Sequence, residues 1–516
     1  MNGSEALIKA LADAGVDTCF ANPGTSEMSL VAALDKEPRI RSVLALFEGV
    51  ATGAADGYGR MADKPALTLL HLGPGFANGA ANLHNARRAR SPVLNMVGDH
   101  ATWHLELDAP LTSDIRGLAT PVSDWYGVSE SANDLPACGV RALQNALSYP
   151  GQIATFVVPA DHSWDPVTDI DDTTVAVSAE ILTDEHIHLA ADALRNNTRG
   201  ALLLGARALR REALLQAGRI AAATGVRLIS ETFFNRQRRG VDVPVVERLP
   251  YFAEQAAAHL EGLELIMLIG AKAPVSFFAY PNSPSILTPE GATLHELASP
   301  HIDALNTLTR LADALNAPPL AEHVRAPVRH KVEEGTIDAI SLGQLLNNHI
   351  PKDAIVSDEG ATNGLAAYLM STEAEAHDWM TVTGGAIGQG LPLSIGAAIA
   401  CPDRKVIALE ADGSAMYTVQ ALWTMVREQL DITVLILNNS AYAILNIELN
   451  RIGADQVGET ARSLLSLDRP DLRWSTIAEG MGMTASTVRL NSELDQALTN
   501  AMAGRGPCLI EIILPN

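Results

Sequence analysis

The sequence has little of what marks a nucleic-acid-binding, secreted or membrane protein. Its 516 residues include 37 Lys and Arg against 60 Asp and Glu, a formal net charge of −23, so nucleic acid and anionic membranes are not expected as partners. The four cysteines are scattered, without the spacing of a metal site or a disulfide framework. No apolar run is long enough to cross a bilayer, and residues 1–15 have the pattern of an amphipathic helix rather than a signal sequence. These features predict a cytoplasmic protein.

What is present is typical of an α/β protein. Apolar residues make up 47% of the chain, there are 39 glycines, and short apolar runs alternate with helix-like stretches. Such runs are expected of parallel strands that are buried on both faces. The chain of 516 residues is also too long for a single core. We therefore expect three doubly wound parallel-sheet domains, over residues 1–165, 180–320 and 338–516.

Residues 406–441, in the third expected domain, carry the clearest chemical signal. Apolar runs at 406–411 and 432–437 indicate two strands joined by a helix, and they are followed by Asp412 and by Asn439. In a right-handed β-α-β unit the C-terminal ends of the two strands lie side by side, so these two side chains can bind one cation. One carboxylate and one amide oxygen, with room for phosphate oxygens, suit octahedral Mg²⁺.

This segment resembles the fingerprint of thiamine-diphosphate (ThDP) enzymes, in which Gly-Asp-Gly is followed, a helix and a strand later, by Asn-Asn. Ala411 replaces the first glycine here. The resemblance implies ThDP and Mg²⁺ as cofactors, with the backbone carbonyl of Ala441 as a further metal ligand. The N–H groups at the start of the helix, those of Gly413 and Ser414, would cradle the diphosphate.

A second motif near the N-terminus supplies a carboxylate for the other half of this cofactor. Glu48 precedes a run of nearly all small residues, 49–59, which would allow a flat ring to approach closely. An acid shielded by apolar neighbours keeps its proton more readily, which suits a hydrogen bond to a ring nitrogen. The resemblance implies that Glu48 drives the aminopyrimidine of ThDP into its imino form. The alternative is a solvated glutamate that only favours the helix dipole.

Two further segments agree with the resemblance. In the segment 383–392, Ile387 takes the position of the bulky residue that bends ThDP into a V shape, with Gly385 beside it. Thr362 and Asn363 match a second loop that contacts the diphosphate. The chain as a whole is similar to the decarboxylase and acetolactate synthase superfamily, with a pyrimidine-binding, a middle and a diphosphate-binding domain in that order. It looks closest to acetolactate synthase large-subunit-like proteins.

The first domain also looks like benzoylformate decarboxylase. In that enzyme a strand-end Asn-Pro-Gly-Ser supplies a hydroxyl that contacts substrate, and this chain has Asn-Pro-Gly-Thr-Ser at 22–26. Thr25 or Ser26 is therefore a candidate for binding a substrate carboxylate, unless it caps the next helix. His71, at another strand end, is a candidate acid or base, with a purely structural histidine as the alternative. The second histidine of that family, expected near 277–280, is missing.

The expected substrate pocket is apolar. Leu445 stands where pyruvate decarboxylases carry a glutamate that handles protons, and their paired histidines are absent. With Leu111 and Ile444 it would leave few proton donors above the reacting carbon of ThDP. The enamine left by CO₂ loss would then be protonated slowly, and capture by a second carbonyl compound would compete.

The expected function is Mg²⁺- and ThDP-dependent decarboxylation of a 2-oxo acid with carboligation to a carbonyl acceptor, as in acetolactate synthase. Three alternatives stay open: a benzoylformate-type decarboxylase that releases aldehyde, a 2-hydroxyacyl-CoA or oxalyl-CoA lyase, and a catalytically silent subunit of the same fold. The sequence does not specify the donor or the acceptor. FAD is not expected in the middle domain. Because the two halves of ThDP bind to different domains, we expect a homodimer or homotetramer with sites at subunit interfaces.

Overall fold

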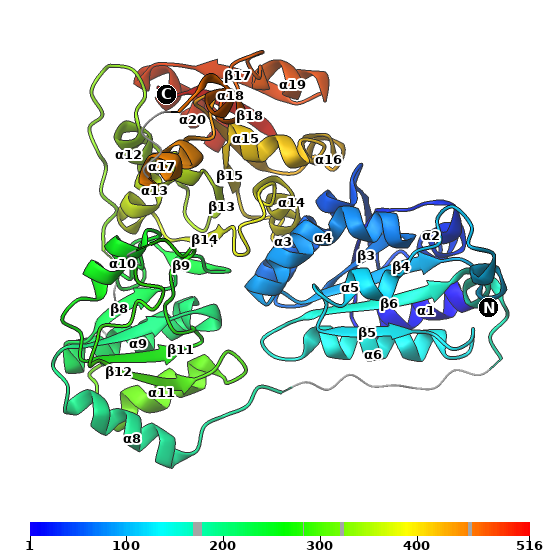
Figure 1. Cartoon of the computed structure of the whole chain (residues 1–516), viewed down its shortest axis with the longest axis horizontal. Coiled ribbons are helices and arrows are strands. Elements are labelled where there is room, and N and C mark those ends of the chain that lie inside the picture. Colours follow the sequence, from blue (N-terminus) through cyan, green and yellow to red (C-terminus); the bar gives the residue numbers. More distant parts are fainter. Residues whose placement is uncertain (169–177, 282, 320–324, 453–456, 516) are drawn as a thin grey trace.

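Three sheets of parallel strands organise the chain, and helices cover their faces (Figure 1). The computed structural model describes residues 1–516 except 169–177, 282, 320–324, 453–456 and 516. The predicted α/β fold class with three parallel sheets is confirmed. Among the described residues, no helix is both long and apolar enough to cross a membrane.

The N-terminal sheet has six strands in the order β2-β1-β3-β4-β6-β5. The four central strands, β1, β3, β4 and β6, are buried along nearly their whole length. The strands are β1 (Thr18–Asn22), β2 (Arg41–Leu44), β3 (Ala66–His71), β4 (Val93–Asp99), β5 (Trp125–Val128) and β6 (Ile153–Pro159). The helices are α1 (Gly3–Asp13), α2 (Met28–Asp35), α3 (Glu48–Ala62), α4 (Leu72–Ala89), α5 (Ile115–Ala119), α6 (Leu135–Leu147) and α7 (Ala160–Trp164), with 3-10 turns η1 (Thr25–Glu27) and η2 (Thr102–Leu107).

The middle sheet has five strands in the order β10-β8-β7-β11-β12. These strands are β7 (Gly200–Leu204), β8 (Arg227–Ser230), β10 (Glu247–Arg248), β11 (Leu265–Ile269) and β12 (Thr293–Ala298). The surrounding helices are α8 (Asp184–Arg195), α9 (Arg211–Thr224), α10 (Ala253–Leu260) and α11 (Ala304–Ala314), with the 3-10 turn η3 (Ala206–Leu209).

The C-terminal sheet has seven strands in the order β17-β18-β16-β15-β13-β14-β9. Its strands are β9 (Gln237–Arg239), β13 (Ile355–Glu359), β14 (His377–Thr381), β15 (Val406–Ala411), β16 (Ile432–Asn438), β17 (Thr484–Val488) and β18 (Cys508–Ile513). Its helices are α12 (Ala339–His349), α13 (Ala361–Met370), α14 (Gly390–Ala400), α15 (Asp412–Ala415), α16 (Ala421–Arg427), α17 (Ala443–Arg451), α18 (Glu459–Leu465), α19 (Trp474–Gly480) and α20 (Asn491–Ala503), with η4 (Ser371–Glu373) and η5 (Met416–Thr418). Strand β9 comes from the middle of the sequence and pairs antiparallel with β14 at the sheet edge.

The N-terminal and C-terminal sheets share a core through the pair of helices α3 and α14, which lie against each other between them (Figure 1). Small residues make this close packing possible. A Cβ atom on Gly57 would lie 2.0 Å from the carbonyl oxygen of Leu393, and one on Gly396 would lie 1.9 Å from that of Ala54. The run of small residues after Glu48 therefore serves helix packing, and it fixes α3 against the C-terminal sheet.

Candidate active site

The two predicted metal ligands lie at adjacent strand ends. Strands β15 and β16 pair in parallel up to Ala411 and Leu437, so Asp412 and Asn439 follow neighbouring strands. The Oδ2 atom of Asp412 accepts a hydrogen bond from the N–H of Ser440 at 2.8 Å, which ties the two strand ends together directly. The β-α-β geometry expected from the sequence is present in the structure.

Asp412 is a desolvated carboxylate. Its side chain is 1% exposed, and burial raises its pKa to about 6. Backbone N–H groups work in the other direction, among them that of Gly413, which donates to Oδ1 at 2.8 Å. Among the residues that the structure describes, no cationic side chain contributes to this shift. A buried carboxylate that lacks a counter-charge fits a bound cation.

The rest of the donor set fits Mg²⁺ on a diphosphate. No group of three or more His, Cys, Asp and Glu side chains suited to a metal is found among the described residues, so the metal would rely on Asp412, the Asn439 amide, a backbone carbonyl such as that of Ala441, and phosphate oxygens. Gly413 and Ser414 are buried in the first turn of α15. A Cβ on Gly413 would lie 2.4 Å from the ring of Tyr442, so only glycine leaves this space open.

The loop that carries Ile387 is held from both sides. Asn85 of α4 donates to the carbonyl of Ala386 at 2.7 Å and accepts from its N–H at 3.1 Å. From β13, Glu359 accepts from the N–H of Gly388 at 2.8 Å. Gly385 has φ +76°, a conformation that favours glycine. Ile387 therefore lies in a fixed loop between the N-terminal and C-terminal sheets.

Glu48 begins α3 and is 8% exposed. Among the described residues its carboxylate accepts one hydrogen bond, from the side chain of Asn78 on α4 at 2.9 Å. Gly75 on the same helix lies against it, because a Cβ there would be 3.1 Å from Glu48 Oε1. No sequence pattern indicates a role for Asn78, whose position next to Glu48 depends on the packing of α4 against α3.

His71 and Ser26 come together with a residue to which no role was assigned from sequence. The Nδ1 atom of His71 lies 2.8 Å from Glu27 Oε2 and 3.3 Å from Ser26 Oγ. Glu27 is fully buried and also accepts from Ser26 Oγ and from the N–H of Gly24, both at 2.7 Å. Thr25, in contrast, is exposed. The structure thus groups Ser26, Glu27 and His71, and leaves Thr25 at the surface.

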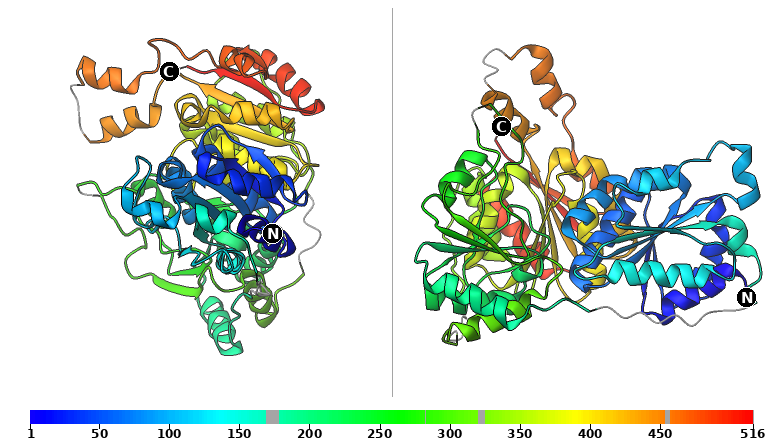
Figure 2. Two further views of the ribbon diagram at one scale, coloured as in Figure 1. Left: turned by 90° about the vertical axis from the view of Figure 1, so that its right-hand side faces the viewer. Right: turned by 60° about the horizontal axis from the view of Figure 1, so that its bottom comes forward.

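The predicted pocket residues divide between two parts of the chain. Leu111 follows η2 in the N-terminal part, whereas Ile444 and Leu445 lie on α17. In Figure 1 α17 lies beside the C-terminal sheet and away from the N-terminal sheet, and Figure 2 shows the chain in two further views. Thr362 and Asn363 are half-buried in the first turn of α13.

The segment 277–280, where the second histidine of benzoylformate decarboxylase is missing, makes a different polar contact. Tyr280 donates a hydrogen bond of 2.6 Å to Glu448, which is on α17, one turn beyond Ile444. The middle part of the chain therefore contacts the helix that carries two of the predicted pocket residues.

A buried carboxylate at one strand end, a glycine-lined helix start and a shielded glutamate at the start of α3 define a thiamine-diphosphate enzyme, and the chain belongs to that family. Residues 1–118 match the family "Thiamine pyrophosphate enzyme, N-terminal TPP binding domain", and residues 358–512 match "Thiamine pyrophosphate enzyme, C-terminal TPP binding domain". ThDP-binding domains are thus present at both ends of the chain.

Comparisons over the full length agree. The chain is 48% identical over 517 residues to the "Putative acetolactate synthase large subunit IlvX" of Mycobacterium tuberculosis, covering 100% of this chain and 99% of the relative. It is 28% identical to a benzoylformate decarboxylase of Pseudomonas aeruginosa, covering 96% of each. The fold matches that of a 4-hydroxybenzoylformate decarboxylase from Rhodococcus jostii RHA1 with a TM-score of 0.87, at 24% identity over 100% of this chain and 99% of that chain. The resemblance predicted from the motifs is confirmed.

Proposed function

We propose that the chain is a Mg²⁺- and ThDP-dependent enzyme that decarboxylates a 2-oxo acid and joins the remaining acyl unit to a carbonyl acceptor. The observation that carries this proposal is the apolar start of α17, directly after the proposed metal site. There Leu445 is 45% exposed and Ile444 is half-buried. Because both side chains are hydrocarbons, neither can protonate the acyl unit. The 48% identity to a relative named for acetolactate synthase supports the same proposal.

Each residue of the site has a role in this proposal. Bound ThDP would supply a carbon nucleophile that adds to the keto group and stabilises the electron pair left by CO₂. Asp412, Asn439 and the carbonyl of Ala441 would hold Mg²⁺, and Glu48 would hold a proton at a pyrimidine nitrogen. The diphosphate cradle and the bend of the cofactor would be formed by Gly413, Ser414, Thr362, Asn363, Gly385 and Ile387.

A second candidate, simple release of an aldehyde, is favoured by the His71 group. His71 is held by the buried Glu27 and lies next to Ser26, so a hydroxyl and an imidazole are available together for a substrate carboxylate and a proton. The two candidates share the same decarboxylation and differ in the fate of the acyl unit.

Product analysis separates them. Purified enzyme with Mg²⁺ and ThDP is given a panel of aliphatic and aromatic 2-oxo acids, with and without excess carbonyl acceptor, and CO₂ release and products are measured by mass spectrometry. We expect acyloin-type products with an aldehyde acceptor, or 2-hydroxy-3-oxo acids with a 2-oxo acid acceptor, in a yield that rises with acceptor. If aldehyde is the only product even with excess acceptor, the carboligase proposal fails and the decarboxylase replaces it.

Two variants of α17 test the pocket assignment. Leu445→Glu should shift the products toward free aldehyde, because it adds a proton donor to the pocket wall. Ile447→Glu places the same charge on another exposed position of the same helix and should leave the ratio unchanged. CO₂ release from oxalyl-CoA, but from no 2-oxo acid, would identify a CoA-dependent lyase instead. A chain that binds ThDP but does not exchange its C2 proton would be a silent subunit.

A further inference from the structure

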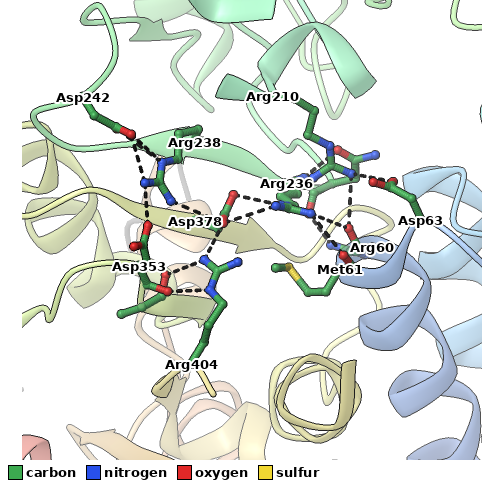
Figure 3. Close-up of polar contacts among 12 residues, drawn as sticks. Arg60, Met61, Asp63, Arg210, Arg236, Arg238, Asp242, Asp353, Asp378 and Arg404 are labelled. Carbon is green, nitrogen blue, oxygen red and sulfur yellow. Dashed lines mark hydrogen bonds and ion pairs between the residues drawn. The ribbon is translucent and has the colours of Figure 1, made fainter. Parts of the chain in front are cut away.

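Two groups of charged side chains in this structure differ in how their charges are satisfied. In the group shown in Figure 3 they pair with one another, and Asp378 on β14 accepts hydrogen bonds from Arg236 Nε at 2.8 Å and Arg404 Nη2 at 2.5 Å. Buried charges ordinarily need such partners. In the second group, none of the four side chains forms an ion pair among the described residues. Its members are Arg90, Glu231, Lys272 and Glu296.

The unpaired charges lie at the carboxyl ends of the strands of the middle sheet. Glu231 follows β8 and Lys272 comes shortly after β11, the two strands on either side of β7. The carboxylate of Glu231 accepts from the N–H of Lys272 at 3.3 Å. A Cβ on Gly205, the residue after β7, would lie 2.5 Å from Glu231 Oε2. The order of the strands reverses between β7 and β11, and a crevice at such a point is the usual ligand site of an α/β sheet.

Two cavities share these charges. The first, of about 440 Å³, is lined by Arg90, Glu231 and Lys272 among other residues, and we call it the polar cavity. The second, of about 430 Å³, is also lined by Arg90 and Lys272, and we call it the apolar recess. The remaining lining of the apolar recess is Glu296 with Leu268, Ala271, Ala273, Leu294 and Pro300. Two cations therefore stand between an acid on one side and an apolar wall on the other.

The opposite charges in the polar cavity are held apart. Glu231 is half-buried, and burial raises its pKa to about 7. The N–H of Lys272 and the charges of Arg90 and Lys272 act in the other direction, but neither side chain is hydrogen-bonded to Glu231. Arg90 is also half-buried, and burial lowers its pKa without a side-chain hydrogen bond to compensate. Lys272 is exposed. Both signs of charge are thus available to a ligand that carries both.

We propose that these two cavities together bind an aliphatic α-amino acid in its zwitterionic form. Its carboxylate would contact Lys272 and lie near Arg90, its ammonium group would contact Glu231, and its side chain would enter the apolar recess beside Leu294. A ligand with a single charge would leave either the acid or the cations without a partner. None of the residues assigned to ThDP, Mg²⁺ or the substrate lines either cavity, so the site does not depend on the proposed reaction.

The first test compares ligands on the unmodified protein. The holoenzyme with ThDP and Mg²⁺ bound is titrated with L-leucine by calorimetry at pH 7 and constant ionic strength. Two analogues of similar shape lack one charge each: 4-methylpentanoate has no ammonium group and 3-methylbutylamine has no carboxylate. We expect saturable binding of one leucine per chain, and binding at least about tenfold weaker for each analogue and for glycine, which has no side chain. No saturable binding of leucine, or an analogue or glycine that binds as tightly as leucine, would overturn the proposal.

Glu231 provides a second readout. With a pKa of about 7 it is half protonated at pH 7, and a bound ammonium group favours its ionised form. Binding should therefore release up to about half a proton per leucine, which is measured from the heats in buffers of different ionisation enthalpy. Glu231→Gln should abolish this buffer dependence and weaken leucine binding about tenfold. Glu290→Gln, an exposed glutamate of the middle part, should change neither. A buffer-independent heat in the wild type would contradict contact with Glu231.

Two further variants test the other parts of the site. Lys272→Ala should weaken leucine binding about tenfold, because it removes a charged donor, and should not weaken binding of 3-methylbutylamine, which has no carboxylate. Lys352→Ala, an exposed lysine before β13, is the matched control and should change nothing. Leu294→Asp should reduce leucine binding to the level of glycine. Normal leucine binding by Lys272→Ala would overturn the proposal, and if a variant does not fold, the ligand series on the wild type still decides.

Discussion

Asp412→Asn should have two opposite effects, a more stable metal-free chain and a lost cofactor. Burial raises the pKa of Asp412 to about 6 from its ordinary value of 3.8. One pKa unit corresponds to about 1.4 kcal/mol, so ionised Asp412 costs the metal-free fold about 3 kcal/mol at pH 7.5. Asparagine removes this cost. Its amide has only one oxygen for the two N–H donors of Gly413 and Ser440, which costs about 1–3 kcal/mol. The net expected gain is about 1 kcal/mol.

The pH dependence of this difference tests the reasoning. Because the pKa of Asp412 is raised in the folded state, its ionisation penalty is absent below about pH 4 and nearly complete at pH 7.5. The free energy of unfolding of Asp412→Asn, relative to wild type, should therefore rise by about 1.4 kcal/mol between pH 5 and pH 7.5. The assay is urea denaturation of metal-free protein at both pH values. Asp403→Asn, an exposed aspartate before β15, serves as the control and should show no such trend.

Cofactor binding supplies the second half of the test. With Mg²⁺ present, Asp412→Asn should no longer retain ThDP, because the diphosphate loses its metal bridge. Titration calorimetry measures this directly. Unchanged ThDP affinity would remove Asp412 from the metal site, and a stability difference that does not vary with pH would show that its carboxylate is not desolvated.

Three further predictions concern the rest of the site. Glu48→Gln should keep ThDP bound but stop C2-proton exchange of the bound cofactor, measured by NMR in deuterated buffer; exchange at the wild-type rate would exclude Glu48 from proton transfer. Gly24→Ala should lower kcat at least tenfold without loss of ThDP, because its Cβ would lie 2.2 Å from the ring of His71 and displace it; normal turnover would show that His71 is only structural. Sedimentation at assay concentration should show a dimer or tetramer, since Glu48 begins α3 in the N-terminal part and Asp412 begins α15 in the C-terminal part, and an active monomer would contradict interfacial sites.

The sequence determined the central strands and the motifs at their ends. β1, β3, β15, β16 and β18 are recognisable because strands buried on both faces are mostly apolar along their whole length. Asp412, Asn439 and Glu48 could be located for the same reason, since each directly follows or lies near such a run. The order of residues in the sequence is enough to predict that a side chain follows the end of a strand.

The tertiary structure alone decided the polar edges and the partners. β14 contains His377 and Asp378, so its sequence does not look like a buried strand, yet Arg236 and Arg404 neutralise Asp378 from far away in the chain. In the same way, Glu27 could be read as a residue of an exposed turn, but folding buries it against His71. A buried charge is stable only when other groups pair with it. Here those partners are far away in the sequence, so local sequence patterns do not reveal them.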